Sequence, residues 1–156
     1  MERETQVFHL ARMMQKYSQK PQYELALPFV KIRKSVFEKL SVNDVLLLDM
    51  KVLTFILLKN DVLCANLALQ HVESSEVIVI IEVKSKTKIS KKSTKYKIIK
   101  PSLGTCDIKS LEVGKHLSWT PFDLEKIILL CDEKKLAEGS LVRVDNKLAL
   151  KVDRLF

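Results

Sequence analysis

The chain has 156 residues, of which 47% are hydrophobic and 29% charged, and its formal net charge is +8. This length suits one ordinary domain or two small ones that share a core, and the composition excludes a disordered chain. With only three glycines, a glycine-rich loop that cradles phosphate is not expected.

The first predicted element is an amphipathic helix within residues 1–20. Its apolar residues recur at helical spacing and end before Pro21: Val7, Leu10, Met13, Met14 and Tyr17. The helix either packs on the body of the protein or docks a partner. Its charged start is not that of a signal peptide, so we expect a soluble, cytoplasmic protein.

From Tyr23 onward the pattern predicts strands. YELAL alternates, PFVKIRKSVFEKL predicts a strand that runs into a helical turn, and DVLLLD and VLTFILL are short apolar runs. Lys59-Asn60-Asp61 predicts a turn into VLCANLAL, and EVIVIIEV is the most strand-prone window. Asp49 and Lys51 interrupt the longest apolar stretch, which is too short to span a membrane.

Residues 84–100 contain eight lysines and no acid, which accounts for the whole net charge. Tyr96 is the only aromatic residue there, and arginine is absent. Single-stranded nucleic acids are usually bound by several stacking aromatics, and phosphate favours arginine. A Lys-rich linker at 85–95 or a lysine-guarded edge strand is therefore favoured over the alternative, a small nucleic-acid-binding β protein that uses Lys84–Lys100.

A second series of strands follows and repeats the first. KYKII, LEVGKHLSW and LEKIILL predict strands, and Asp132-Glu133-Lys134 predicts a turn. Leu40–Leu46 matches Leu111–Leu117, 71 positions later, with Asn43 in place of Gly114. Asn is the non-glycine residue that best tolerates left-handed backbone angles. FILLKNDVLCANL likewise matches IILLCDEKKLAEGSL.

The last 18 residues, GSLVRVDNKLALKVDRLF, predict a hairpin. A three-residue loop, Asp145–Lys147, places Val144 opposite Leu148 and gives the hairpin one apolar face, so we expect this register. Val142 would then face the core, and Leu141 would lie on the other face.

The fold class we expect is mainly β with a few short helices (α+β). Each series of strands alone buries too little apolar surface to offset the loss of chain entropy, so we expect two β units that intertwine around one core. The predicted divisions are the helix at 1–20, a first unit at 22–84, the linker at 85–95 and a second unit at 96–156.

No pattern in the sequence predicts catalysis, a metal or a cofactor. There is no G-x-S-x-G nucleophile turn and no Walker or Rossmann glycine pattern. Asp44 and Asp49 would lie on opposite faces of a strand. Cys64, Cys106 and Cys131 have no zinc-ligand spacing and fit a reducing cytosol. We expect a protein that is not an enzyme.

LEVGKHLSW followed by LEKIILLCDEKKLAEGSLVRVDNKLALKVDRLF resembles the SpoA domain of flagellar motor switch proteins and of type III secretion ring proteins. The matching features are Leu111 with Gly114, the strand Ile127–Leu130, and Glu138-Gly139 before the final hairpin. LPFVKIRKSVFEKLSVNDVLLLD resembles the start of another copy. The end of that copy departs through the longer polar loop QHVESSE and lacks the glycine step.

The resemblance implies intertwined β pairs and a scaffold in the cytoplasmic ring, or sorting platform, of a bacterial type III secretion system. Such a subunit binds the stator protein of the export ATPase and other ring proteins, associates with itself or with other SpoA domains, and is peripheral to the inner membrane through its partners. A flagellar motor switch subunit is the alternative. The family's partner-binding patch falls on Leu141, Val142 and Arg143, and Arg143 interrupts its apolar run.

Overall fold

The computed structural model describes residues 22–88, 95–118 and 122–156. These residues form one antiparallel sheet of eleven strands and one short helix, which confirms the expectation of a mainly β protein. The helix predicted within residues 1–20 lies outside the described residues. The described part of the chain contains no apolar helix of membrane-spanning length.

The elements fall into two halves. The first half (residues 22–88) contains β1 (Gln22–Ala26), β2 (Val30–Arg33), α2 (Lys34–Glu38), β3 (Val45–Leu47), β4 (Thr54–Lys59), β5 (Val62–Val72) and β6 (Ser75–Lys88). The second half (residues 95–156) contains β7 (Tyr96–Asp107), β8 (His116–Ser118), β9 (Ile127–Cys131), β10 (Lys134–Val144) and β11 (Lys147–Leu155).

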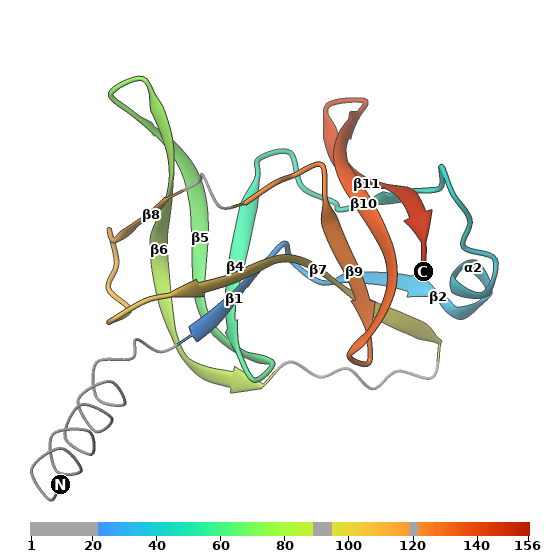
Figure 1. The fold of residues 1–156 in the computed structure, drawn as a ribbon, viewed down its shortest axis with the longest axis horizontal. Coiled ribbons are helices and arrows are strands. Elements are labelled where there is room, and N and C mark those ends of the chain that lie inside the picture. The colour runs from blue at the N-terminus through green and yellow to red at the C-terminus, as the bar shows by residue number, and fades with distance from the viewer. Residues whose placement is uncertain (1–21, 89–94, 119–121) are drawn as a thin grey trace, which may run out of the picture.

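The strand order of the sheet is symmetric: apart from β2, each strand of one half has an equivalent strand of the other half at the same distance from the centre. It runs β3-β11-β10-β9-β7-β1-β4-β5-β6-β8, and β2 pairs with β7 beside this path. β1 and β7 meet at the centre, and each is followed outward by a hairpin-connected series from its own half. Figure 1 shows β7 crossing the middle of the molecule, with β4, β5 and β6 on one side and β9, β10 and β11 on the other.

Each half supplies the outermost strand of the other. β3, from the first half, pairs with β11, with Leu46 opposite Leu150. β8, from the second half, pairs with β6, with Leu117 opposite Ile78. Leu46 and Leu117 are the matched positions of the sequence repeat. The exchange ties the two halves together at both edges of the sheet.

The predicted turns after β4 and β9 are two-residue loops. Asn60 and Asp61 have φ of 52° and 61°, and Asp132 and Glu133 have φ of 50° and 66°. Positive φ at both positions suits type I′ turns, whose twist matches that of a hairpin. The longer polar loop expected at residues 70–76 is wrong, because β5 and β6 are joined by only two residues.

Two matched irregularities bend the long hairpins. The β10–β11 register shifts between Glu138 and Gly139, where a Cβ on Gly139 would lie 2.7 Å from the Lys151 carbonyl oxygen. The β5–β6 register shifts at the equivalent step, between Asn66 and Leu67. The first half therefore has the same bulge, although it has no glycine at the position equivalent to Gly139.

The predicted register of the last hairpin is wrong. Val144 lies opposite Lys147, so the loop is Asp145 and Asn146, with φ of 48° and 68°. The prediction assumed one apolar and one polar face. Residues 148–150 are all buried, so this part of β11 is covered on both faces and side-chain alternation could not set the register.

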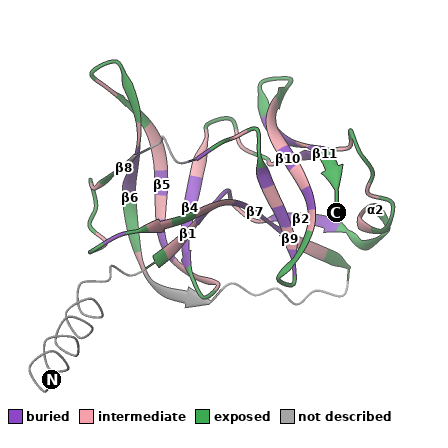
Figure 2. Cartoon of the chain, viewed as in Figure 1, coloured by how far each residue is buried: buried purple, intermediate pink, exposed green. Residues whose placement is uncertain are grey.

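One hydrophobic cluster contains buried side chains from both halves. The first half contributes Leu25, Phe55, Leu57 and Ile80 among others, and the second half contributes Ile99, Ile127, Leu129 and Val152 among others. Figure 2 shows buried residues along the central strands and exposed residues at the hairpin tips. The two halves therefore share the larger interior, and a smaller cluster of Ala26, Ile56 and Leu58 belongs to the first half alone.

The strand β6 extends into the segment predicted as a linker. It ends at Lys88, with Thr87 opposite Leu63 of β5. Residues 85–88 are thus part of the sheet and not of a linker. A strand in this segment was the other possibility that the sequence left open. Residues 89–94 lie outside the described part, and the domain boundaries at 84 and 96 stay a prediction.

Candidate partner-binding surface

The three residues that we expected to bind a partner, Leu141, Val142 and Arg143, lie on β10. Leu141 is opposite Leu150, and its N–H donates to the Leu124 carbonyl oxygen at 2.9 Å. Its side chain packs against the shared hydrophobic cluster. Val142 is partly exposed and lies outside that cluster, and Arg143 is exposed.

The predicted assignment of Leu141 and Val142 is therefore reversed. Leu141 faces the core, whereas Val142 lies on the other face of β10, because the two-residue loop shifts the pairing by one position. The Arg143 guanidinium donates to the Asn146 carbonyl oxygen at 3.4 Å. Of the three residues, Val142 is the one apolar side chain that is partly exposed and lies outside the hydrophobic cluster, so it could contact a partner.

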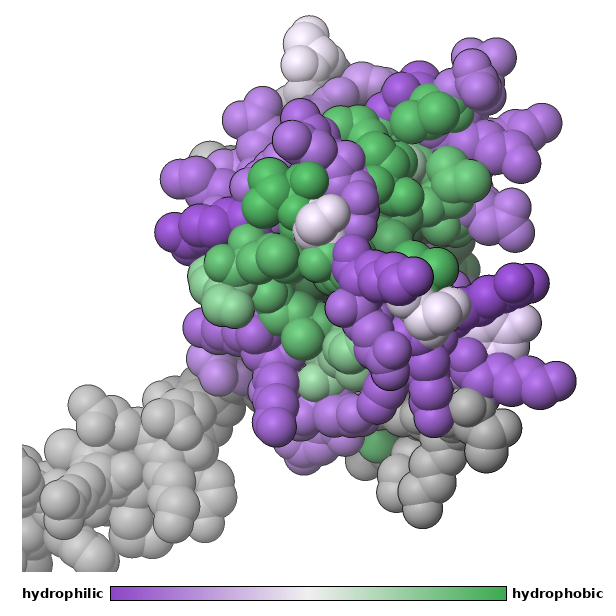
Figure 3. Space-filling view, turned by 90° about the vertical axis from the view of Figure 1, so that its right-hand side faces the viewer, coloured by the Kyte–Doolittle hydropathy of each residue, from purple (hydrophilic) through white to green (hydrophobic). Residues whose placement is uncertain are grey.

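A larger group of exposed apolar side chains lies at the end of the molecule with α2 and the C-terminus. Its members come from α2, from the segment around β3 and from the last two residues: Val36, Val42, Val45, Leu47, Leu155 and Phe156. Figure 3, which views this end, shows a hydrophobic area surrounded by hydrophilic side chains. We call these six residues the apolar end.

The sequence did not identify the apolar end. DVLLLD is a continuous apolar run, which is typical of a strand buried on both faces. In the structure only Leu46 of β3 is buried, while Val45 and Leu47 are 45% and 57% exposed. Side chains alternate between the two faces of a strand, so Val45 and Leu47 lie on the face opposite to Leu46, and the described residues leave that face uncovered. Exposed apolar areas of this kind mark sites where proteins associate.

A buried lysine lies between the two halves. The Lys100 ammonium lies 2.7 Å from Glu24 Oε1, 3.3 Å from Asp61 Oδ1 and 3.8 Å from Glu133 Oε1. Asp61 and Glu133 belong to the equivalent turns of the two halves. Ser102 Oγ donates to Glu24 Oε2 at 2.8 Å. Lys100 thus joins β7 to β1 and to both turns.

The electrostatics of this cluster favour a structural role. Burial lowers the pKa of Lys100, but the hydrogen bond and charge of Glu24, and then those of Asp61, outweigh burial and raise the pKa above its ordinary value. Lys100 is therefore charged at neutral pH and is a poor nucleophile. The ammonium group is also unavailable for phosphate binding, which argues against the hypothesis that Lys84–Lys100 binds a nucleic acid.

The thiol of Cys106, further along β7, is also a weak nucleophile. Burial, and then the charge of Asp107, raise the pKa of Cys106 to about 11. A thiolate is the reactive form of cysteine, so this thiol is a weak nucleophile at neutral pH. Within the described ranges, no group of three His, Cys, Asp or Glu side chains is placed to hold a metal ion.

A scan against protein-family models and a search of curated proteins found no match to this chain.

Proposed function

We propose that this protein is a structural subunit of the cytoplasmic ring of a bacterial type III secretion system. In this proposal its halves are two SpoA-like units that intertwine into one body. The subunit binds the stator protein of the export ATPase and other ring proteins, and it lies at the cytoplasmic face of the inner membrane through those partners. It has no catalytic role.

The exchange of β3 and β8 between the halves carries the proposal. The resemblance to SpoA domains implied intertwined pairs, and each half gives its outermost strand to the other half. The bulge at Asn66 and Leu67 and the two-residue turn between β5 and β6 support a first copy of the same type. A body whose halves complete each other is suited to serve as a building block.

The apolar end supports binding to another protein. Six exposed apolar side chains in one region are more than the scattered exposed residues of an ordinary surface. Val142 of the family's patch adds a partly exposed position on β10. A partner that covers these residues would remove apolar surface from water at roughly 25 cal/mol per Å².

Co-elution with the export-ATPase stator protein on size-exclusion chromatography tests the proposal. The full chain is expected to shift to a stable complex, and Val42→Asp with Leu47→Asp should weaken that complex at least tenfold. Val113→Asp is a matched control, because Val113 occupies the position of Val42 in the other half and is 66% exposed. A chain that never co-elutes with any stator protein would refute the ring assignment, and binding to a flagellar stator alone would favour the motor switch alternative.

A further inference from the structure

A basic pocket lies where β2 ends, α2 begins and β7 starts. Its volume is about 440 Å³, and its lining residues are Arg33, Lys34, Ser35, Lys95 and Tyr96. The strands β2 and β7 hold the rim together, since Arg33 lies opposite Tyr96 and the Lys34 N–H donates to the Lys95 carbonyl oxygen at 3.2 Å. The cationic residues thus come from two segments far apart in sequence.

The lining residues make the pocket attractive to anions. Of the five described residues that line it, three carry a positive charge and none is acidic, and Ser35 and Tyr96 add hydroxyl groups that can donate hydrogen bonds. The next basic residue of β7, Lys97, is directed elsewhere, with its ammonium 5.7 Å from the Phe37 ring centroid and 4.0 Å from Asp132 Oδ2.

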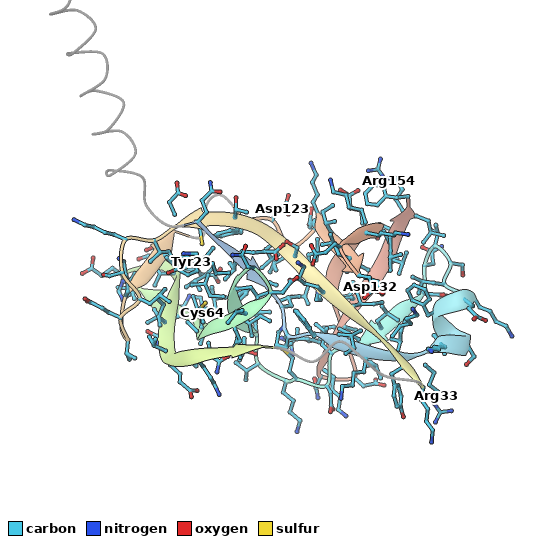
Figure 4. The ribbon with its side chains drawn as sticks, turned by 90° about the horizontal axis from the view of Figure 1, so that it is seen from below. Tyr23, Arg33, Cys64, Asp123, Asp132 and Arg154 are labelled. Atoms are coloured by element: carbon cyan, nitrogen blue, oxygen red, sulfur yellow. The ribbon has the colours of Figure 1, made fainter. Side chains whose placement is uncertain are left out.

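The pocket breaks the equivalence of the two halves. α2 follows directly from β2 in the first half, whereas in the second half the described chain has no helix and β7 continues to Asp107. Figure 4 shows Arg33 projecting from one end of the molecule, away from Tyr23 and Cys64. A partner that recognises the pocket would therefore bind one end of an otherwise repeated body, with one copy per chain.

Apolar side chains beside the pocket indicate what the anion is attached to. Val36, next to Ser35 on α2, is 46% exposed, and Tyr96 is 39% exposed. A carboxylate that enters the pocket would bring its neighbouring residues onto this apolar surface. Nucleic acids are held by cations spread along several phosphates, whereas three cations around one pocket suit a single acidic group.

We propose that this pocket binds an acidic side chain in a short segment of a partner protein, with apolar residues of that segment covering Val36 and Tyr96. Arg33 would form paired hydrogen bonds with the carboxylate, and Lys34 and Lys95 would add charge. The proposal does not depend on the secretion-ring assignment, because it follows from the pocket alone.

Fluorescence anisotropy with a labelled peptide that alternates Glu and Leu tests this. The full chain should bind it, and Arg33→Gln with Lys34→Gln should weaken binding at least tenfold. The matched control is Lys109→Gln with Lys126→Gln, which removes the same charge from two exposed positions elsewhere and should change affinity less than twofold. Circular dichroism establishes that both variants are folded.

Three results would overturn the proposal: no binding of the Glu-Leu peptide, equal binding of the same peptide with Gln in place of Glu, or equal losses in the two double variants. Binding of single-stranded RNA or of anionic phosphatidylserine vesicles, with no binding of the peptide, would assign the pocket to another class of partner. Since the assay contains no secretion protein, its failure and the failure of the stator experiment are distinguishable.

Discussion

Asn43 and Gly114 make the same backbone contact from opposite halves of the protein. The Asn43 N–H donates to the Val152 carbonyl oxygen at 2.7 Å, and the Gly114 N–H donates to the Ile80 carbonyl oxygen at 2.7 Å. Their φ angles are 76° and 91°. Each residue turns the chain into the short strand that pairs with the other half.

Changing the residue at these two turns should affect stability according to its tolerance of positive φ. Gly114→Ala is expected to lower the free energy of unfolding by about 1 kcal/mol, as is Asn43→Ala, because a Cβ is strained in this backbone region. A Cβ at Gly114 would meet no atom within 4 Å, so the loss would come from the backbone alone. Urea unfolding measures this loss as a lower urea midpoint, with the same m-value in the variant and the wild type.

Asn43→Gly is the control for these turns. It should leave the urea midpoint within a few tenths of a kcal/mol of the wild type, since glycine adopts positive φ without strain. A loss as large as that of Asn43→Ala would show that the Asn side chain, and not its backbone angle, matters at this turn.

Removing the buried ammonium should destabilise the junction of the halves. Lys100→Met leaves Glu24 and Asp61 without their cation and is expected to cost roughly 3 kcal/mol at neutral pH. Glu24→Gln in the same chain should recover part of this, so the double-mutant cycle should give a coupling of at least about 1 kcal/mol. Additive losses would mean that the 2.7 Å contact contributes little to stability.

Alkaline pH should weaken the fold through Cys106. The pKa of Cys106 is raised to about 11 in the folded protein, so the folded state favours the protonated thiol. The contribution of this thiol to the free energy of unfolding is complete below the ordinary thiol pKa and is lost as the pH rises toward the pKa of the folded state. Between about pH 9 and 11 the wild type should lose stability on the order of 1 kcal/mol more than Cys106→Ser. Chemical unfolding at a series of pH values measures the difference, and parallel curves would contradict it.

The sequence predicted the repeated order of strands but not the details of pairing. The turns at Asn60-Asp61 and Asp132-Glu133 were predicted because polar turn residues separate two apolar segments there. The continuation of β7 was missed because Pro101 and Gly104 ordinarily end strands. In the structure the Pro101 carbonyl oxygen accepts a hydrogen bond from the Leu27 N–H at 2.9 Å, so the strand continues across them.

The candidate surfaces were harder to predict than the fold. Arg33 and Lys95 are distant in sequence, and only the pairing of β2 with β7 brings them to one pocket. The exposure of Val45 and Leu47 depends on which face of β3 the rest of the protein covers, which a local apolar pattern cannot reveal. Leu141 was placed on the wrong face because a one-residue change in the loop changes which residues of β11 share a face with those of β10.

Cutting the chain between the halves tests the shared interior most directly. A protease site inserted among residues 89–94 would separate the strands of the two halves without removing any described residue. After cleavage, the two pieces are expected to remain together at the original mass in native mass spectrometry and to separate only when unfolded in urea. Two pieces that part under native conditions and stay folded would contradict the account.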